Sequence, residues 1–217
     1  MRRGYHARLA PMKLLTGMVL SLSICAAIAQ TPIEGKNYQL LRPAVAAPGD
    51  RIEVIEFFYY GCAVCYETQP HFSRWLATSG GKVALVRIPA VFTESSESFA
   101  RTFYALGALN ELDRLHWPLY DNHHFDGRQL NEYPNIVKWV AANGVDRARF
   151  EALWNSPDVT TQLEAAKKAL ATYQVKGVPS FVVDGRYLTS AKAAGGTREV
   201  VRVVDYLVER TSTQRKK

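Results

Sequence analysis

The sequence predicts an α/β fold in which a run of helices separates two groups of strands. Residues 51–60 form an apolar run that is typical of a strand buried on both faces over most of its length. Residues 95–173 follow a helical pattern throughout, and residues 180–188 return to β structure. This order predicts a split α/β domain with a helical insertion.

The chain before residue 95 predicts three strands and one long helix. Residues 37–41 are expected to form a short edge strand ahead of the strand at 51–60. That strand leads into Gly61, after which a helix is expected to run to about Thr78. A glycine turn then precedes a further strand at residues 82–88.

The helical segment at 95–173 carries helix-start signals. Ser156 and Pro157 supply an N-cap and a first helical position, and an apolar stripe follows them at helical spacing. Asp146 is placed to cap a helix over residues 147–154. We therefore expect several helices here.

The last part of the chain predicts a hairpin and a final helix. Asp184 and Gly185 stand at the centre of residues 180–188 and form a two-residue turn signal between two short strands. A helix is then expected over about residues 197–210, because its valines and leucine repeat at helical spacing.

Residues 1–29 have the composition of a cleavable export signal. They contain four basic residues and no acid, and an apolar stretch over residues 14–28 ends in an Ala-Ile-Ala motif. This motif places small residues where a signal peptidase reads them, so cleavage is expected before Gln30. A start at Met12 is an open alternative, because the segment from there is itself a compact signal.

Removal of this segment changes both the charge and the cysteine count. The formal net charge falls from +7 to +3, since four positive charges and no negative charge are lost. The basicity is then weak evidence for nucleic acid, and we expect no nucleic-acid partner. Cys25 is lost with the signal, so Cys62 and Cys65 remain, in a compartment where disulfides persist.

Cys62 and Cys65 stand two residues apart directly after the apolar strand. At the start of a helix the first sulfur is stabilised as a thiolate, and the second lies close enough to resolve a mixed disulfide. The alternatives are a structural disulfide and half of a zinc site. A disulfide closing so short a loop removes little unfolded-state entropy. Zinc usually needs four ligands, and the chain offers no second Cys-x-x-Cys and no histidine pair at zinc spacing, so thiol–disulfide exchange is favoured and no metal is expected.

Two motifs together resemble the thioredoxin superfamily. They are Glu-Phe-Phe-Tyr-Tyr-Gly-Cys-Ala-Val-Cys at residues 56–65 and Val-Lys-Gly-Val-Pro-Ser-Phe-Val-Val at residues 175–183. Within the superfamily the chain resembles the DsbA family of periplasmic dithiol oxidases. The resemblance implies a thioredoxin-like domain over residues 30–94 and 174–217, with an inserted helical domain over residues 95–173.

The resemblance also implies roles for individual residues. Cys62 attacks or is attacked, Cys65 resolves, and Pro179 follows a cis peptide bond beside the dithiol, with Val178 before it. A proline in an ordinary loop is the alternative, because cis bonds are only about 5–6% of X–Pro bonds. Glu56 shares a strand face with apolar residues, and the resemblance places an acid here that relays the proton of Cys65. A strand-end glutamate that reaches solvent is the alternative.

The substrate surface is expected to include residues around the dithiol. Val178, Tyr60, Ala63 and Val64 are the candidates, with Tyr60 contributing to an apolar surface. The Ala-Val dipeptide departs from the Pro-His usual in DsbA, whose histidine helps to hold the first cysteine as a thiolate. It offers no charge and no side-chain donor, which places the expected oxidising power between those of DsbA and thioredoxin.

The expected function is a monomeric, exported dithiol–disulfide oxidoreductase that introduces disulfides into newly exported, unfolded proteins. The redox-active disulfide Cys62–Cys65 is expected to serve without a cofactor, and a quinone-linked membrane protein resembling DsbB to reoxidise it in the periplasm. The alternatives are an exported reductant or thiol carrier, for example in cytochrome maturation, and a non-catalytic chaperone on the same fold.

Overall fold

A mixed five-stranded sheet is the centre of the unit Thr31–Lys217. The computed structural model describes residues 1, 30–45, 47, 49–79 and 81–216. The predicted export signal therefore lies, apart from Met1, outside the described residues. The elements are β1 (Gln39–Leu40), β2 (Ile52–Phe58), α1 (Ala63–Thr78), β3 (Val83–Pro89), α2 (Glu94–Ala108), α3 (Leu112–His124), α4 (Tyr133–Ala142), α5 (Arg147–Trp154), α6 (Pro157–Thr172), β4 (Ser180–Val183), β5 (Tyr187–Ser190), α7 (Ala191–Ala194) and α8 (Thr197–Arg215).

Strand β2 has neighbours on both sides within the sheet order β1-β5-β4-β2-β3. It pairs in parallel with β3 and antiparallel with β4, and β4 continues into β5 through a hairpin. The register sets Glu56 opposite Arg87 on one side and opposite Phe181 on the other. The carboxyl end of β2, which leads to the dithiol, therefore lies between two strands.

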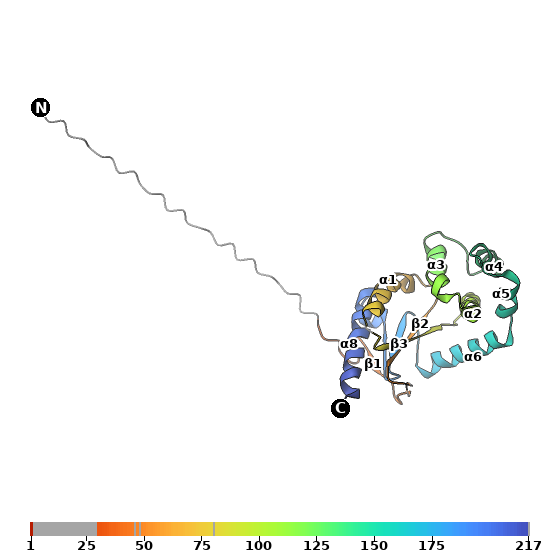
Figure 1. Ribbon diagram of the computed structural model, residues 1–217. Helices are drawn as coiled ribbons and strands as arrows, with labels where there is room; N and C mark the ends of the chain where they lie inside the picture. The colour runs from red at the N-terminus through yellow and green to blue at the C-terminus, as the bar shows by residue number, and fades with distance from the viewer. Residues whose placement is uncertain (2–29, 46, 48, 80, 217) are drawn as a thin grey trace. The chain divides into compact units, whose positions relative to one another are not determined.

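Each face of the sheet has its own apolar core. Alternate residues of β2 and β4, such as Val54 and Phe181, pack against Phe72 of α1 and the valines of α8. The opposite face, with Ile55 and Phe57, packs against the end of α6. Figure 1 shows α1 and α8 together beside the sheet and α2 to α6 gathered beyond it.

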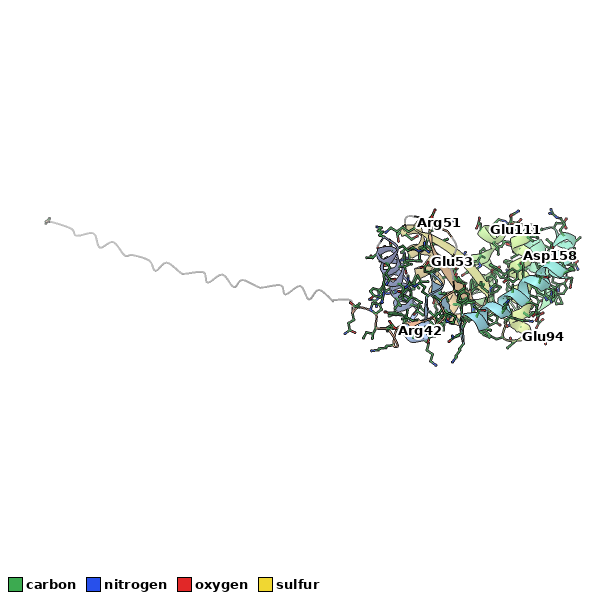
Figure 2. The ribbon with its side chains drawn as sticks, turned by 90° about the horizontal axis from the view of Figure 1, so that it is seen from below. Arg42, Arg51, Glu53, Glu94, Glu111 and Asp158 are labelled. Atoms are coloured by element: carbon green, nitrogen blue, oxygen red, sulfur yellow. The ribbon has the colours of Figure 1, made fainter. Side chains whose placement is uncertain are left out.

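A third core lies where the helices α2 to α5 meet the end of β2. Phe58, Tyr60 and Cys65 are buried in it with aromatic and aliphatic residues of these helices. Acidic residues stand at the starts of α2, α3 and α6, where Figure 2 labels Glu94, the α3 N-cap Glu111, and Asp158. Negative charge at these positions is favourable, because the N-terminus of a helix carries partial positive charge.

The predicted order of strands and helices is confirmed, with two differences at the end of the chain. The last helix extends to Arg215 rather than to about residue 210, and the short helix α7 precedes it. The division into two domains at residues 95 and 173 stays a prediction. Of the helices in the described part of the chain, none is long and apolar enough to cross a membrane.

Candidate active site

The dithiol lies at the junction between β2 and α1. Cys62 is the N-cap of α1, with extended backbone angles (φ −92°, ψ 112°), and its Sγ accepts a hydrogen bond from the backbone N–H of Cys65 at 3.1 Å. Both cysteines are free thiols; Cys62 is half-buried and Cys65 is buried. A sulfur at the first helical N–H groups is where a helix stabilises negative charge.

The environment gives the two thiols opposite acidities. Hydrogen bonds from the Cys65 thiol and from the backbone N–H groups of Cys65 and Val64 lower the pKa of Cys62, against the effect of partial burial. Burial raises the pKa of Cys65 well above its ordinary value, and the neighbouring Cys62 raises it further. Cys62 is therefore the more acidic and Cys65 the less acidic thiol of the reduced pair.

The loop before β4 reaches the dithiol from the other end of the sequence. The Val178–Pro179 peptide bond is cis, as the resemblance implies. The Cys62 thiol donates to the backbone carbonyl of Val178 at 3.7 Å. Pro179 is buried and Val178 is half-buried. The antiparallel pairing of β4 with β2 sets this loop beside the start of α1.

Glu56 is buried in a polar cluster beneath Cys65. Its side chain is fully buried, Gln69 of α1 donates to Oε1, and Nε of Arg87 donates to Oε2 at 3.0 Å. Burial raises the pKa of Glu56, although the Arg87 guanidinium and the hydrogen bonds lower it in part. Glu56 does not reach solvent, so the alternative of a strand-end glutamate does not describe it.

Gln69 and Arg87 are site residues that the sequence analysis missed. Gln69 lies four residues after Cys65 and therefore on the same face of α1, and Arg87 is the one charge in the apolar strand β3. Those two signals were available in the sequence. Their meeting at Glu56 was not, because it depends on strand register and helix packing.

The dipeptide between the cysteines faces solvent. Ala63 is exposed, and Val64 is 42% exposed, which leaves an apolar side chain next to the reactive sulfur. Trp117, on α3, is exposed to the same extent and stacks on Tyr66 of α1 at 5.3 Å between ring centroids. An apolar surface therefore borders the dithiol.

Tyr60 differs from the sequence-based expectation. Its side chain is completely buried, and its hydroxyl bonds to Nδ1 of His116 at 2.7 Å, so it does not line a surface for substrate. β2 ends at Phe58, and the turn that follows directs Tyr60 into the core of the helical layer. The Tyr60 carbonyl accepts from Nε2 of His124 at 2.7 Å, which ties the end of β2 to α3.

The histidines near the site are held in aromatic surroundings. Burial lowers the pKa of His116 to about 3, so it is neutral beside Tyr60. His124 stacks on Tyr66 at 5.0 Å. Within the described part of the chain, histidine, cysteine, aspartate and glutamate side chains do not gather in any group of three that could hold a metal ion.

The fold agrees with comparisons to known proteins. The family described as a DSBA-like thioredoxin domain matches residues 83–207. The thiol:disulfide interchange protein DsbA of Burkholderia cepacia is 30% identical over 209 residues, which cover 94% of this chain and 99% of that protein. The protein of the same name from Pseudomonas aeruginosa PAO1 is 32% identical, over 94% of this chain and 98% of the relative.

The chain belongs to the DsbA family.

Solved DsbA structures have the same architecture. The crystal structure of Pseudomonas aeruginosa DsbA superposes with a TM-score of 0.79 at 33% identity, covering 86% of this chain and 97% of that one. DsbA from Xylella fastidiosa gives 0.78 at 29% identity, over 84% and 98%. This DsbA-family protein is thus a thiol:disulfide oxidoreductase with a thioredoxin fold. The family works through an active-site disulfide of its own.

Proposed function

We propose that this DsbA-family protein oxidises pairs of cysteines in newly exported proteins, through a mixed disulfide at Cys62. The observation that carries the proposal is the contrast between its two thiols. Cys62 is half-exposed, with a lowered pKa, at the N-terminus of α1. Cys65, behind it, is buried with a raised pKa.

The reaction transfers two electrons from the substrate to the protein. A substrate thiolate attacks Sγ of Cys62 in the Cys62–Cys65 disulfide, that bond breaks, and Cys65 leaves with the electron pair and takes up a proton. The second substrate thiolate then attacks the substrate sulfur of the mixed disulfide. The substrate disulfide forms and Cys62 leaves as a thiolate. Its lowered pKa makes it a better leaving group than an ordinary cysteine.

Glu56 is proposed to handle the proton of Cys65. Cys65 is cut off from solvent by the core of the helical layer. Burial is the main cause of its raised pKa, and the Glu56 carboxylate adds to the rise. A carboxyl group whose own pKa is raised by burial exchanges protons closer to neutral pH than an exposed one. Arg87 forms an ion pair with Glu56, and its half-buried side chain extends from this carboxylate to solvent.

The cis-proline loop is proposed to hold the substrate backbone. The Val178 carbonyl lies against the Cys62 thiol, so an extended segment bound at Cys62 can pair with the backbone at Val178. The exposed side chains of Ala63 and Val64 then provide an apolar surface that side chains next to the substrate cysteine can contact.

The location and the partners are part of the proposal. Export to the periplasm rests on the composition of residues 1–29. Disulfides persist there, and unfolded exported proteins supply the cysteines. A quinone-linked membrane protein resembling DsbB is the proposed reoxidant, and the redox-active pair Cys62–Cys65 is proposed to act as a monomer without a cofactor.

One feature favours a second candidate, an exported reductant or thiol carrier. The Ala63-Val64 dipeptide places neither a charge nor a side-chain hydrogen-bond donor beside Cys62. Less stabilisation of the thiolate means a weaker preference for the reduced state and therefore less oxidising power.

Equilibration with glutathione separates the two candidates. Alkylation and mass measurement give the fraction of protein in which Cys62 and Cys65 are joined at each ratio of reduced to oxidised glutathione. We expect a potential between about −270 mV, typical of thioredoxin, and about −120 mV, typical of DsbA. A value at or below that of thioredoxin contradicts an oxidase. The Cys62→Ser variant, which cannot form the disulfide, is the control.

A further inference from the structure

A pocket of about 430 Å³ opens beside the cis-proline loop, next to the dithiol. Val178 and Pro179 line one end of it, and Val178 is the residue whose carbonyl lies 3.7 Å from Sγ of Cys62. The rest of the lining comes from the segment around β1, from β5 and from α7. Any polypeptide held at Cys62 and at Val178 therefore has this pocket beside one of its flanks.

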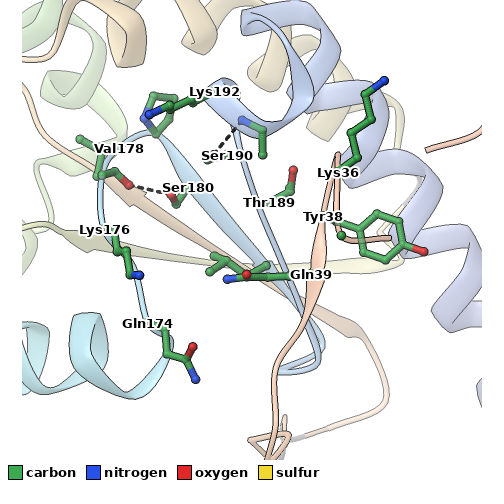
Figure 3. A pocket seen from close by; sticks show the side chains of 15 residues that line it. Lys36, Tyr38, Gln39, Gln174, Lys176, Val178, Ser180, Thr189, Ser190 and Lys192 are labelled. Carbon is green, nitrogen blue, oxygen red and sulfur yellow. Dashed lines mark hydrogen bonds between the residues drawn. The ribbon is translucent and has the colours of Figure 1, made fainter. Parts of the chain in front are cut away.

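The charge of the pocket is of one sign. Lys36, Lys176 and Lys192 line it from three separate segments of the chain, and its lining residues include no aspartate or glutamate. Figure 3 shows the three side chains at separate places around the pocket, whose lining also includes Gln39 and Gln174. Glu34 is the acid next to this lining in sequence, and it is not part of the lining.

The three lysines are available to a ligand. All three are exposed, and among the ion pairs of the described residues none involves them. Three lysines around one recess, with no acid in its lining, raise the local concentration of anions there. On the α1 side of the dithiol stands an exposed acid, Glu67, two residues after Cys65.

We infer that this pocket selects substrate segments with acidic residues on one side of the reacting cysteine. The inference rests on the proposed function, since it concerns the polypeptide that Cys62 oxidises. An acidic flank laid in the pocket meets three lysine ammonium groups that form no ion pair among the described residues, whereas acids on the opposite flank lie away from this pocket. The preference is thus for the position of the acids and not only for their number.

The test uses dithiol peptides of equal length oxidised by a stoichiometric amount of the oxidised protein. One peptide carries two aspartates before the reacting cysteine, one carries them after it, and one carries serines at both places. Acid quenching and mass measurement give the rate constants. At low salt we expect one acidic peptide to react about threefold to tenfold faster than the serine peptide, and the other to gain little. The gain should disappear at about 0.5 M salt.

Variants assign the effect to the pocket. Replacement of Lys36, Lys176 and Lys192 by Glu should invert the preference. Replacement of the same three lysines by Gln should remove the preference, and this variant is used if the Glu variant does not fold. The matched control replaces Lys138, Lys168 and Lys216, which are exposed elsewhere, by Glu. It has the same net charge as the reversed variant and should keep the wild-type ratio.

The outcomes separate this inference from the proposed function. Equal gains for both acidic peptides, or a ratio unchanged by the pocket variants, overturn the inference while oxidation of the serine peptide still supports the oxidase. A loss of preference in the control variant also overturns it, because net charge then explains the effect. Failure to oxidise any peptide contradicts the proposed function itself.

Discussion

Only two residues separate Cys62 from Cys65 in the sequence, yet the surroundings that set the acidity of a thiol differ at the two positions. Cys62 lies before the first turn of α1, where backbone N–H groups point at its sulfur. Cys65 lies within that turn, buried against aromatic residues of the helical layer and above the Glu56 carboxylate. The pKa of the first is lowered and that of the second is raised.

The difference arises from the hydrogen bond between the two thiols, from burial and from the backbone at the start of the helix, and not from a charged side chain between the cysteines. Ala63 and Val64 provide no charged side chain, so the stabilisation of Cys62 comes from the partner thiol and from backbone groups. A reactive cysteine can therefore be built from the backbone of a helix start and one buried neighbour.

Replacement of either cysteine by serine has the largest expected effect, because each variant removes one of the two roles in thiol exchange. Cys62→Ser should abolish the oxidation of peptide dithiols, because no group remains that forms the mixed disulfide. Cys65→Ser should instead trap mixed disulfides at Cys62, since nothing resolves them. Rates and masses after acid quenching measure both. Trapping by Cys62→Ser rather than by Cys65→Ser would reverse the assigned roles.

A charged neighbour should sharpen the contrast. The double variant Ala63→Pro with Val64→His adds a group that can carry positive charge beside Cys62, so its pKa should fall further. For this two-electron couple about 30 mV corresponds to about 1.4 kcal/mol, or one pKa unit, and we expect a potential higher by tens of millivolts. Equilibrium with glutathione measures it.

The Ala63→Pro single variant controls for the backbone of the helix start. It should shift the potential less than the double variant, because it adds no charge. A wild-type protein that is more oxidising than the double variant would show that a group outside the dipeptide controls the thiolate.

Replacement of the acid beneath Cys65 should have a smaller effect that depends on pH. Burial raises the pKa of Glu56 in the folded state, so its contribution to stability is full below the unfolded value of about 4.3 and is lost as pH rises through the folded value. The unfolding free energy of the wild type relative to Glu56→Gln should therefore fall as pH rises through that window. Denaturant unfolding at several pH values measures the difference.

Glu56→Gln should also change the rate of thiol exchange. Thiol exchange should slow by a few fold below neutral pH, because the amide cannot carry the proton of Cys65. Glu164→Gln, at an exposed position on α6, is the matched control and should follow the wild type in both measurements. An unchanged rate–pH profile in Glu56→Gln would remove this residue from the mechanism.

Local patterns were sufficient to predict the strand, the turn and the helix that carry the dithiol. An apolar run followed by glycine and a helix start specifies the place of Cys62 without knowledge of the rest of the chain. The cis bond before Pro179 was implied only by the family resemblance, because nothing in the local sequence distinguishes it from an ordinary loop proline.

The remaining parts of the site depend on contacts between distant segments. Arg87 and Gln69 meet Glu56 through strand register and helix packing, which a single sequence does not reveal. Tyr60 was expected at the surface, but the strand ends two residues before it, and the turn sends its ring towards His116 on α3. The apolar character of a side chain does not tell whether a turn directs it to the surface or into the core.

Titration of the reduced protein tests the contrast between the two cysteines most directly. Thiolate absorbance near 240 nm, followed in the wild type and in the Cys62→Ser and Cys65→Ser variants, reports how each sulfur ionises. We expect one thiol of the wild type to ionise below the ordinary cysteine value of about 8.5, and this transition to be absent in Cys62→Ser. The same low transition in Cys62→Ser, or none below about 8.5 in the wild type, would contradict the assignment of Cys62 as the nucleophile.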